Sequence, residues 1–333
     1  VHYDYLVMAT GLQLNYNKIK GLPEGFDTDP SLCSVYDYNL VQKTLPAIQN
    51  FKGGNAIFTL PNTPIKCSGA PQQIMYLADE MWTENGIRDK ANIYYNSSLP
   101  VIFYVQKYAD TLLNVLDRRG ITVNYMRNLI EVRTDTKEAI FQKLDSPKGE
   151  TETFKYDFLH VTPPMSTPDP VRESPLVGST GFVEVDKETL QHVKYPNIFA
   201  LGDCSNVPTS KTSAAAATQG GYLEKNLNAV MNGKQPYAKY DGYSSCPVIT
   251  SRGKCILVEF NYDCLPLETF PFNQAKERRS MYFLKKNIIP QIYWHMMMRG
   301  LWNGPKFLRK VIHLGMDGPE KDYTHPKDIK SND

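Results

Sequence analysis

Apolar and polar residues follow one another along this chain in blocks that predict strands and helices in turn. Residues 55–60 and 91–95 are short apolar runs typical of buried strands, and residues 120–125 follow a glycine stop as a third strand. Between them, residues 71–82 and 105–118 carry apolar side chains at helical spacing. Strands that alternate with helices favour a parallel sheet covered on both faces, so this region predicts an α/β domain.

A further apolar run, residues 198–201, ends in a glycine and a carboxylate. Gly202 and Asp203 are followed by an alanine-rich stretch that predicts a helix. Gly202 allows the backbone to approach a ligand closely, and the Asp203 carboxylate can accept hydrogen bonds from ligand hydroxyls. The start of the helix offers free N–H groups to an electron-rich edge. The strand, the turn and the helix start therefore form a candidate cofactor-binding motif.

The loop after the first strand of the α/β domain, residues 60–71, lacks the glycine fingerprint of NAD(P)-binding domains. Pro61, Pro64 and Pro71 remove amide donors that would hold a pyrophosphate. After the second strand, residues 96–98 (Asn-Ser-Ser) occur where an acidic residue would bind a ribose hydroxyl. The sequence thus predicts the fold of a nucleotide-binding domain without its nicotinamide site.

Six cysteines occur in the chain, with no C-x-x-C pair and no paired Cys/His spacing that suggests a metal site. Cys67 lies in the altered loop, just before a helix start and next to Lys66, and both features favour a lowered thiol pKa. Cys246 follows a turn signal at residues 241–242 and precedes a strand that begins at a proline. Taken singly, each is more often structural than redox-active. The other four are interpreted as small buried hydrophobes.

The C-terminal region combines positive charge with many large apolar side chains. Residues 276–314 hold nine Lys/Arg and one acid, a net charge of +8, whereas the whole chain carries +2. The longest stretch without formal charge, residues 287–298, contains Pro290 and is shorter than the roughly 18 residues of a spanning helix. Basic, aromatic-rich amphipathic segments lie in the plane of a membrane interface. Two alternatives stay open: helices packed on the core, and nucleic-acid binding, which the Met, Trp and Ile content disfavours.

Several segments have counterparts in one flavoprotein family. They are Tyr-Leu-Val-Met-Ala-Thr-Gly ending at residue 11, the strand–Gly–Asp–helix motif, and residues 65–76, 159–165, 186–192, 241–247 and 276–278. The chain resembles the mitochondrial sulfide:quinone oxidoreductases of animals, within the pyridine nucleotide-disulfide oxidoreductase-like flavoproteins, from Tyr3 to about Gly315. The G-x-G-x-x-G loop that would cradle the FAD pyrophosphate is absent from all 333 residues. We therefore interpret the chain as a fragment without its N-terminal part.

The resemblance implies FAD as cofactor and Cys67 and Cys246 as the redox-active pair. It implies hydrogen sulfide as the electron donor, ubiquinone as the electron acceptor, and glutathione, sulfite or cyanide as the sulfur acceptor, at the mitochondrial inner membrane. The residues expected at the FAD site are Gly11, Gly202, Asp203, Lys211, Ser213, Ala214, Ala215 and Ala216. Lys211 would stabilise negative charge on reduced flavin, although a solvated surface lysine is an equal alternative.

The expected fold is α/β, with two Rossmann-like dinucleotide-binding domains and a C-terminal membrane-associating region. Residues 1–50 and 162–235 would form an incomplete FAD domain, split around a degenerate NAD(P)-type domain at 51–161. Residues 236–333 would form the C-terminal domain, with strands near Val248 and at 255–260 and a disordered tail after Met316. Two other functions stay open: an NADH:quinone oxidoreductase of the same architecture, and a non-catalytic remnant that cannot retain FAD.

Overall fold

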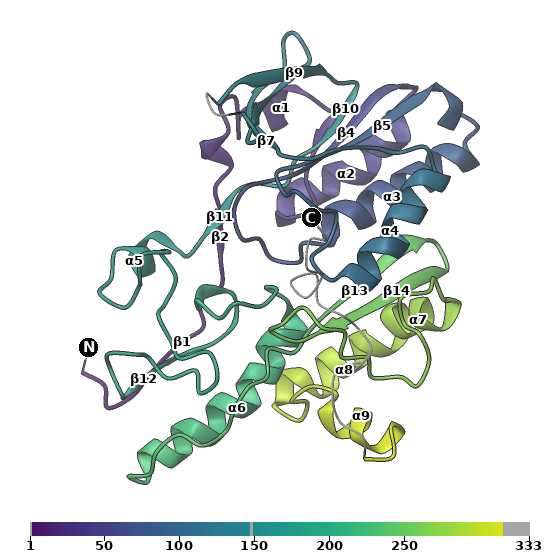
Figure 1. The fold of residues 1–333 in the computed structure, drawn as a ribbon. Coiled ribbons are helices and arrows are strands. Elements are labelled where there is room, and N and C mark those ends of the chain that lie inside the picture. The colour runs from purple at the N-terminus through teal and green to yellow at the C-terminus, as the bar shows by residue number, and fades with distance from the viewer. Residues whose placement is uncertain (1, 147–148, 316–333) are drawn as a thin grey trace, which may run out of the picture.

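The computed structural model describes residues 2–146 and 149–315. The described chain forms an upper α/β unit and a lower unit built around one long helix and a β-hairpin (Figure 1). The segment after Met316, which the sequence suggested to be disordered, lies outside the described residues.

A five-stranded parallel sheet is the centre of the upper unit, and its strand order is β3–β10–β4–β5–β6. These strands are β3 (Leu32–Cys33), β4 (Gly54–Leu60), β5 (Ala91–Ser97), β6 (Thr122–Asn124) and β10 (Phe158–His160). The three strands expected from the apolar runs are present and parallel, which confirms the α/β prediction. β3 comes from the segment that the sequence assigned to the first domain. The sheet therefore includes a strand from before the expected domain boundary at residue 50. The sequence did not predict this strand, because two residues are too few to show an alternating pattern.

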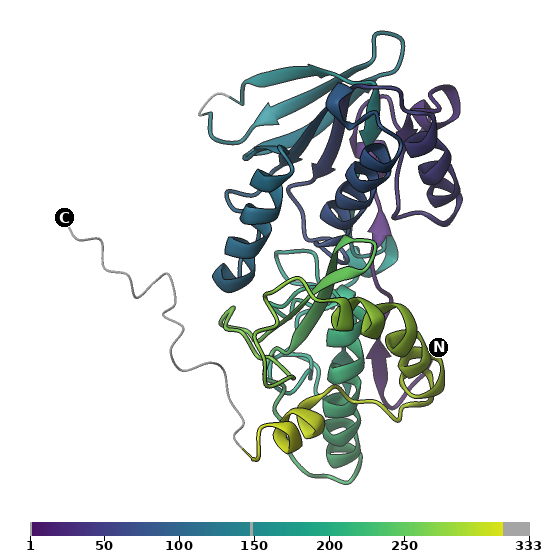
Figure 2. The same ribbon diagram turned by 90° about the vertical axis from the view of Figure 1, so that its right-hand side faces the viewer.

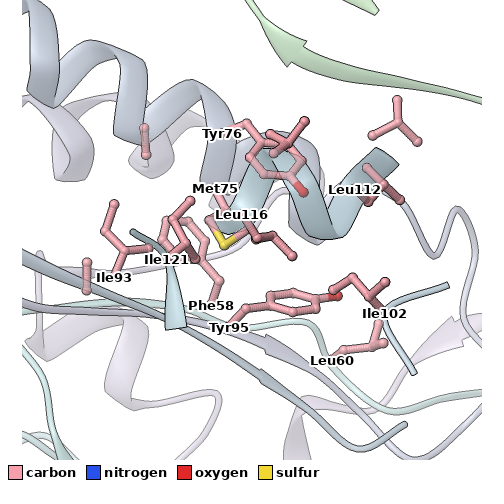
Figure 3. Packing of buried hydrophobic residues seen from close by; sticks show 14 of the residues in the cluster. Phe58, Leu60, Met75, Tyr76, Ile93, Tyr95, Ile102, Leu112, Leu116 and Ile121 are labelled. Atoms are coloured by element: carbon pink, nitrogen blue, oxygen red, sulfur yellow. The ribbon is translucent and has the colours of Figure 1, made fainter. Parts of the chain in front are cut away.

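Helices cover one face of this sheet. They are α2 (Tyr38–Asn50), α3 (Ala70–Glu84) and α4 (Gln106–Arg118), and the last two confirm the helices expected at 71–82 and 105–118. Figure 3 shows Met75 of α3 and Leu112 of α4 packed in the same cluster as Phe58 and Tyr95 of the sheet. All four side chains are fully buried.

The other face of the sheet is covered mainly by strands. An antiparallel sheet of β7 (Arg127–Arg133), β8 (Glu138–Lys143) and β9 (Thr151–Lys155) lies over it (Figure 1). Ile57 points to this side, next to Leu159 and Phe141, whereas its neighbour Phe58 faces the helices, as the alternation of strand side chains requires. The sheet is thus buried on both faces, as its near-continuous apolar strands predict.

The lower unit joins segments that are distant in the sequence. β1 (Leu6–Met8) pairs in parallel with β12 (Ile198–Ala200), and the long helix α6 (Ser213–Met231) follows β12. β13 (Ser244–Ser251) and β14 (Lys254–Phe260) form an antiparallel hairpin that packs against α3. The alanine-rich helix and both C-terminal strands are confirmed. A short ribbon of β2 (Gln13–Leu14) and β11 (Met165–Ser166) connects the two units.

The C-terminal helices lie beside α6 and the hairpin (Figures 1 and 2). They are α7 (Arg279–Phe283), the π-helical turn η4 (Leu284–Ile288), α8 (Ile289–His295) and α9 (Lys306–Ile312). A Cβ on Gly221 of α6 would lie 2.6 Å from the Asn303 side chain, so this close approach requires glycine. Within residues 2–146 and 149–315, no helix combines the length and apolar character needed to cross a bilayer.

The remaining short elements complete the connections. They are α1 (Gly25–Thr28), α5 (Asp169–Arg172), and the 3₁₀ turns at Tyr16–Lys18, Arg88–Lys90, Gly202–Cys204 and Met297–Arg299.

Candidate active site

A cavity of about 740 Å³ lies where the two units meet. Its walls come from the end of β1, the segment before α2, the loop before α3, the turn between β12 and α6, strand β13 and the C-terminal helices. Both candidate cysteines, Cys67 and Cys246, are among these walls. The volume is within the range of about 300–1,000 Å³ that small-molecule and cofactor sites occupy.

The sulfur atoms of Cys67 and Cys246 lie 3.9 Å apart, although the residues are separated by 179 positions. Both are free thiols, Cys67 half-buried and Cys246 buried. A disulfide bond is about 2.05 Å long, so these sulfurs are in contact and a small movement would join them. Cys246 lies inside β13, which begins at Ser244, and not ahead of the strand as expected. Pro247 is tolerated within the strand because the hairpin has only two strands.

The loop before α3 holds Cys67 in an unusual backbone conformation. Its φ is +51°, in the left-handed region that costs a residue with a side chain about 1–3 kcal/mol. The Cys67 N–H donates to the Lys211 carbonyl over 2.8 Å. Its carbonyl accepts from the Tyr36 hydroxyl at 3.0 Å and from the Ala70 N–H at 2.9 Å. These three bonds fix the direction in which the thiol points, and they link the loop to both units.

Gly69 lets the two thiols approach each other. A Cβ on this residue would lie 2.7 Å from the Cys246 sulfur and 3.2 Å from a Val248 methyl group. Real Cβ atoms do not approach a sulfur atom so closely, so a side chain at position 69 would push β13 away from the loop. The sequence patterns did not single out Gly69, because its role depends on a strand that is distant in the chain.

The surroundings of the two thiols shift their pKa values in opposite directions. The hydrogen bond with Cys246 is the largest cause that lowers the pKa of Cys67, to about 7, with help from the Lys285 charge and the amides at the start of α3. Burial opposes this shift. The same hydrogen bond, together with burial, raises the pKa of Cys246 well above its usual value. Cys67 is therefore the thiol of the pair that ionises first, and Cys246 is the S–H donor once Cys67 is a thiolate. The assisting cation is Lys285 rather than the adjacent Lys66 that the sequence suggested.

The glycine–aspartate turn lines the same cavity as the thiol pair, and the lining includes Gly11, Gly202 and Asp203. Gly11 has φ +67°, and a Cβ added to it would have no atom within 4 Å, so its backbone is open to a ligand. Gly202 has φ +70°, a conformation that favours glycine. Burial raises the pKa of the Asp203 carboxyl, and the Lys211 and Lys66 charges oppose this shift.

The start of α6 supplies the remaining expected contacts. The Thr212 hydroxyl caps the helix by accepting the Ala215 N–H at 3.1 Å. Ser213 and Ala216 line the cavity, whereas Ala214 and Ala215 do not. Ala215 is 2% exposed and belongs to the core, and Ala214 packs against that core. The helix presents one face to the cavity, so only part of the alanine run can contact a ligand.

Lys211 is not the solvated surface lysine of the alternative interpretation. Its ammonium donates to the Ser205 carbonyl at 2.8 Å and lies 4.6 Å from the centre of the Phe182 ring. Burial lowers the pKa of Lys211 to about 8, and the Asp203 carboxylate opposes this effect. Lys211 therefore lies as a half-buried cation at the cavity wall.

A second cavity of about 660 Å³ lies beyond the ends of β4 and β5, where a nucleotide would bind in an intact domain. Leu60, Pro61 and Pro64 line it, together with aromatic side chains such as Phe103 and Phe260. Lys211 is the one charged residue among its lining residues in the described chain. This largely apolar surface suits a nicotinamide dinucleotide poorly, because no cluster of cations faces its phosphates.

Two further wall residues were not expected as site residues. Tyr36 lies between β3 and α2 and lines the cavity while it bonds to the Cys67 carbonyl. Lys285 lines it from η4 and was counted only among the C-terminal cations. Neither belongs to a motif near the cysteines in the sequence, so no local signal could have identified them.

A dithiol in a cavity between a degenerate nucleotide-binding sheet and a glycine–aspartate turn defines an α/β oxidoreductase of the disulfide-oxidoreductase type. The mitochondrial sulfide:quinone oxidoreductase of Mus musculus is 55% identical over 317 residues, which are 95% of this chain and 70% of the mouse protein. The protein of that name from Dictyostelium discoideum is 46% identical and covers 94% of this chain and 68% of its own length. The chain belongs to the family of mitochondrial sulfide:quinone oxidoreductases.

A comparison with solved structures supports the fold. The X-ray structure of the sulfide:quinone oxidoreductase from Aquifex aeolicus matches 97% of this chain and 76% of its own with a TM-score of 0.71, at 17% identity. No family model matches the chain.

Proposed function

We propose that this protein oxidises hydrogen sulfide at the pair Cys67 and Cys246 and passes the two electrons through FAD to ubiquinone. The observation that carries the proposal is the 3.9 Å contact of the two sulfurs inside a cavity that Asp203 also lines. The names of the relatives give sulfide and quinone as their reactants. A dithiol with one lowered pKa matches the chemistry of sulfur exchange.

The proposed reaction begins from the oxidised pair. Hydrosulfide attacks the Cys246 sulfur, the bond between the two cysteines breaks, and Cys67 leaves as a thiolate. A new sulfur–sulfur bond then holds the substrate sulfur on Cys246 as a persulfide. A thiophilic acceptor such as glutathione, sulfite or cyanide removes the outer sulfur and leaves the Cys246 thiolate. When the two thiolates form the Cys67–Cys246 bond again, two electrons are released. These are the two electrons that the quinone receives, and they come from the net oxidation of sulfide and acceptor to the sulfur-loaded acceptor.

The chain's own residues fit the ring and polyol parts of FAD. Asp203 would accept hydrogen bonds from the ribityl hydroxyls, and the start of α6 at Ser213 would face the electron-rich edge of the ring. The Lys211 ammonium would hold negative charge near that edge. Gly11 leaves the backbone open to close approach, and Gly202 allows the left-handed turn before Asp203. Bound FAD supplies a two-electron acceptor beside the thiolate.

Serine variants test the proposal directly. Cys67→Ser and Cys246→Ser should each slow sulfide-dependent loss of flavin absorbance by at least about 10³-fold, because neither variant can form the bond that sulfide opens. Cys255→Ser is the matched control, since Cys255 is fully buried away from the cavity lining. Normal bleaching rates in both active-site variants would refute the mechanism.

The NADH:quinone alternative differs in its electron donor. The apolar, proline-containing lining of the second cavity disfavours it. Rapid flavin reduction by NADH, with no reduction by sulfide, would favour this alternative. A non-catalytic remnant would instead purify without flavin absorbance and gain none when FAD is added.

Membrane association is the second part of the proposal. The C-terminal helices and their connections expose nine large apolar side chains, which we call the C-terminal apolar surface. They are Phe283, Ile288, Trp294, Met298, Leu301, Phe307, Leu308, Val311 and Leu314. Phe307 is 80% exposed and Trp294 is 63% exposed, so they do not pack on the core as the helix-pair alternative requires. Such exposure, with the exposed cations Lys306 and Lys310 nearby, fits an interfacial segment through which a quinone enters.

Vesicle binding tests this surface. A variant with both Trp294→Ser and Phe307→Ser should bind vesicles of phosphatidylcholine and phosphatidylglycerol about tenfold or more weakly, because two aromatic anchors are lost. Tyr38→Ser is the matched control, since Tyr38 is 81% exposed on α2 in the upper unit. If the double variant and the Tyr38→Ser control bound vesicles equally well, the C-terminal apolar surface would not be a specific membrane-binding surface. That result would also contradict a location at the mitochondrial inner membrane.

A further inference from the structure

One cation joins the two elements that carry the redox thiols. The Lys285 ammonium donates to the Pro247 carbonyl on β13 at 2.6 Å. It also donates to the Gln73 side-chain oxygen in the first turn of α3. Cys67 precedes α3 by three residues, and Cys246 is the neighbour of Pro247. Lys285 therefore contacts both cysteine-bearing elements and lines the same cavity as the two thiols.

A local distortion of the helix carries this lysine to the cavity. Lys285 lies in η4, a π-helical turn inserted between α7 and α8. Turns of this kind widen a helix by one residue and are frequent at functional sites. Here Lys285 is half-buried, while the next residue, Lys286, is exposed and lies over the Tyr282 ring. Two adjacent lysines of the same helix thus have different surroundings, which provides a matched pair for experiment.

We propose that Lys285 is a positioning residue of the thiol pair, which keeps α3 and β13 together and holds Cys67 as the thiolate. Its ammonium is a fixed positive charge beside the sulfur that must leave when the bridge opens. A thiolate that is stabilised in this way is the better leaving group, so the incoming sulfide is directed to Cys246. This inference deepens the proposed function and depends on it only for its catalytic consequence.

Other charged and titratable groups also face Cys67. They are Cys246 on β13, Tyr36 from the segment before α2, Lys66 in the same loop, and Lys211 and Asp203 from the turn before α6. Lys66 and Lys211 remain in every variant described below. A change that follows only the charge at position 285 therefore separates its effect from theirs.

The test measures the alkylation of Cys67 by iodoacetamide against pH, in the reduced protein, with peptide mass spectrometry to identify the residue. Lys285→Met and Lys285→Gln should both raise the pH midpoint of alkylation by about one unit, because loss of a nearby opposite charge raises a thiol pKa by about that much. At pH 7 the thiolate fraction then falls about fivefold, and the higher nucleophilicity of the more basic thiolate offsets part of this, so the rate falls about twofold. Lys285→Arg keeps the charge and should retain the wild-type pH midpoint. Lys286→Met should also retain it.

The glutamine variant separates charge from a structural tie, since it keeps a hydrogen-bond donor. An unchanged pH midpoint of Cys67 alkylation in Lys285→Gln would overturn the proposal. An equal shift of that midpoint in Lys285→Arg would also overturn it. The measurement contains no sulfide and no quinone. A wild-type protein that fails to react with sulfide, yet shows the expected midpoint shifts, would refute the proposed function and leave the role of Lys285 standing.

Discussion

Cys67 and Cys246 line the cavity between the two units, whereas Cys33 and Cys255 lie in the hydrophobic cores, and comparing these two regions shows what makes a thiol reactive. In the cavity, hydrogen bonding and the Lys285 charge lower the pKa of Cys67 to about 7. In the cores, burial raises the pKa of Cys33 and Cys255 to about 12. Cys33 and Cys255 are fully buried and Cys67 is half-buried, and burial acts to raise the pKa of all three, so burial alone does not decide reactivity. What differs is the presence of groups that stabilise the charged form of the sulfur.

The backbone differs between the two regions as well. Cys33 is part of the regular strand β3, and Cys255 is part of β14. Cys67 lies in a left-handed conformation that three hydrogen bonds hold in place. Strain of this kind persists only where the surroundings over-determine it, and it is typical of functional sites. The cavity thus concentrates strain and charge at one thiol, while the cores keep Cys33 and Cys255 neutral and inert. Cys264, which was expected to be buried, is instead half-buried and lines the second cavity.

The largest expected effect is the difference in labelling rate between the cavity thiol and the core thiols. At pH 7, iodoacetamide should label Cys67 about 10³-fold faster than Cys33 or Cys255 in the reduced, folded protein. The thiolate fractions differ by about 10⁵, and the lower nucleophilicity of a low-pKa thiolate removes about two powers of ten. Quantitative peptide mass spectrometry measures the ratio. In urea the three rates should converge, and a fast-reacting Cys33 in the folded protein would contradict the contrast.

The next effect concerns the contact between the two cavity thiols. Gly69→Ala should slow formation of the Cys67–Cys246 disulfide by diamide about 10²-fold, because the added methyl group displaces β13 and misplaces the reacting sulfur. Loss of free thiols over time gives the rate. Gly220→Ala is the control, since nothing lies within 4 Å of a side chain added there. A wild-type rate in Gly69→Ala would mean that the contact does not depend on this close approach.

The smallest effect is on stability against pH. The pKa of Cys67, about 7 in the folded protein, is lowered from about 8.5 in the unfolded chain. Its contribution is therefore fully present above about pH 8.5 and is lost as the pH falls through 7. The stability advantage of the wild type over Cys67→Ser should shrink by up to about 2 kcal/mol between pH 8.5 and 6.

Urea unfolding under reducing conditions measures that difference. Cys246 has a raised pKa, so its contribution is constant below about pH 8.5 and is lost only at higher pH. It therefore cancels within the chosen window. An advantage that grows as the pH falls would show that the Cys67 thiol, and not its thiolate, is the favoured form in the folded protein.

Much of the fold follows from short-range patterns. Strands β4 and β5 and helices α3 and α4 were expected within one or two residues at most ends, because each buries a regular set of apolar side chains. The antiparallel sheet over the second face was not expected. β3 was missed because two residues carry no period, and its place in the sheet depends on β10, which lies more than 100 residues later.

The candidate site also has a part that the sequence indicates and a part that only the packing decides. The turn at Gly202 and Asp203 and the start of α6 are contiguous in the chain, and the sequence alone indicates them. The spacing of the alanines does not reveal which ones face the cavity, and Ala214 and Ala215 turn out to belong to the core side. A helix face is defined only when its packing partners are known.

Local patterns in the chain were enough to predict the order of strands and helices and the loss of the nicotinamide fingerprint, and the family resemblance of the sequence pointed to Cys67 and Cys246 as the pair to test. The folded arrangement was needed to show that these sulfurs touch, that Gly69 makes the contact possible, and that Lys285 is the cation beside them. Local patterns act over a few residues, whereas the pKa of a thiol depends on every charge within several ångströms. In this protein those charges come from segments as far apart as residues 67, 246 and 285.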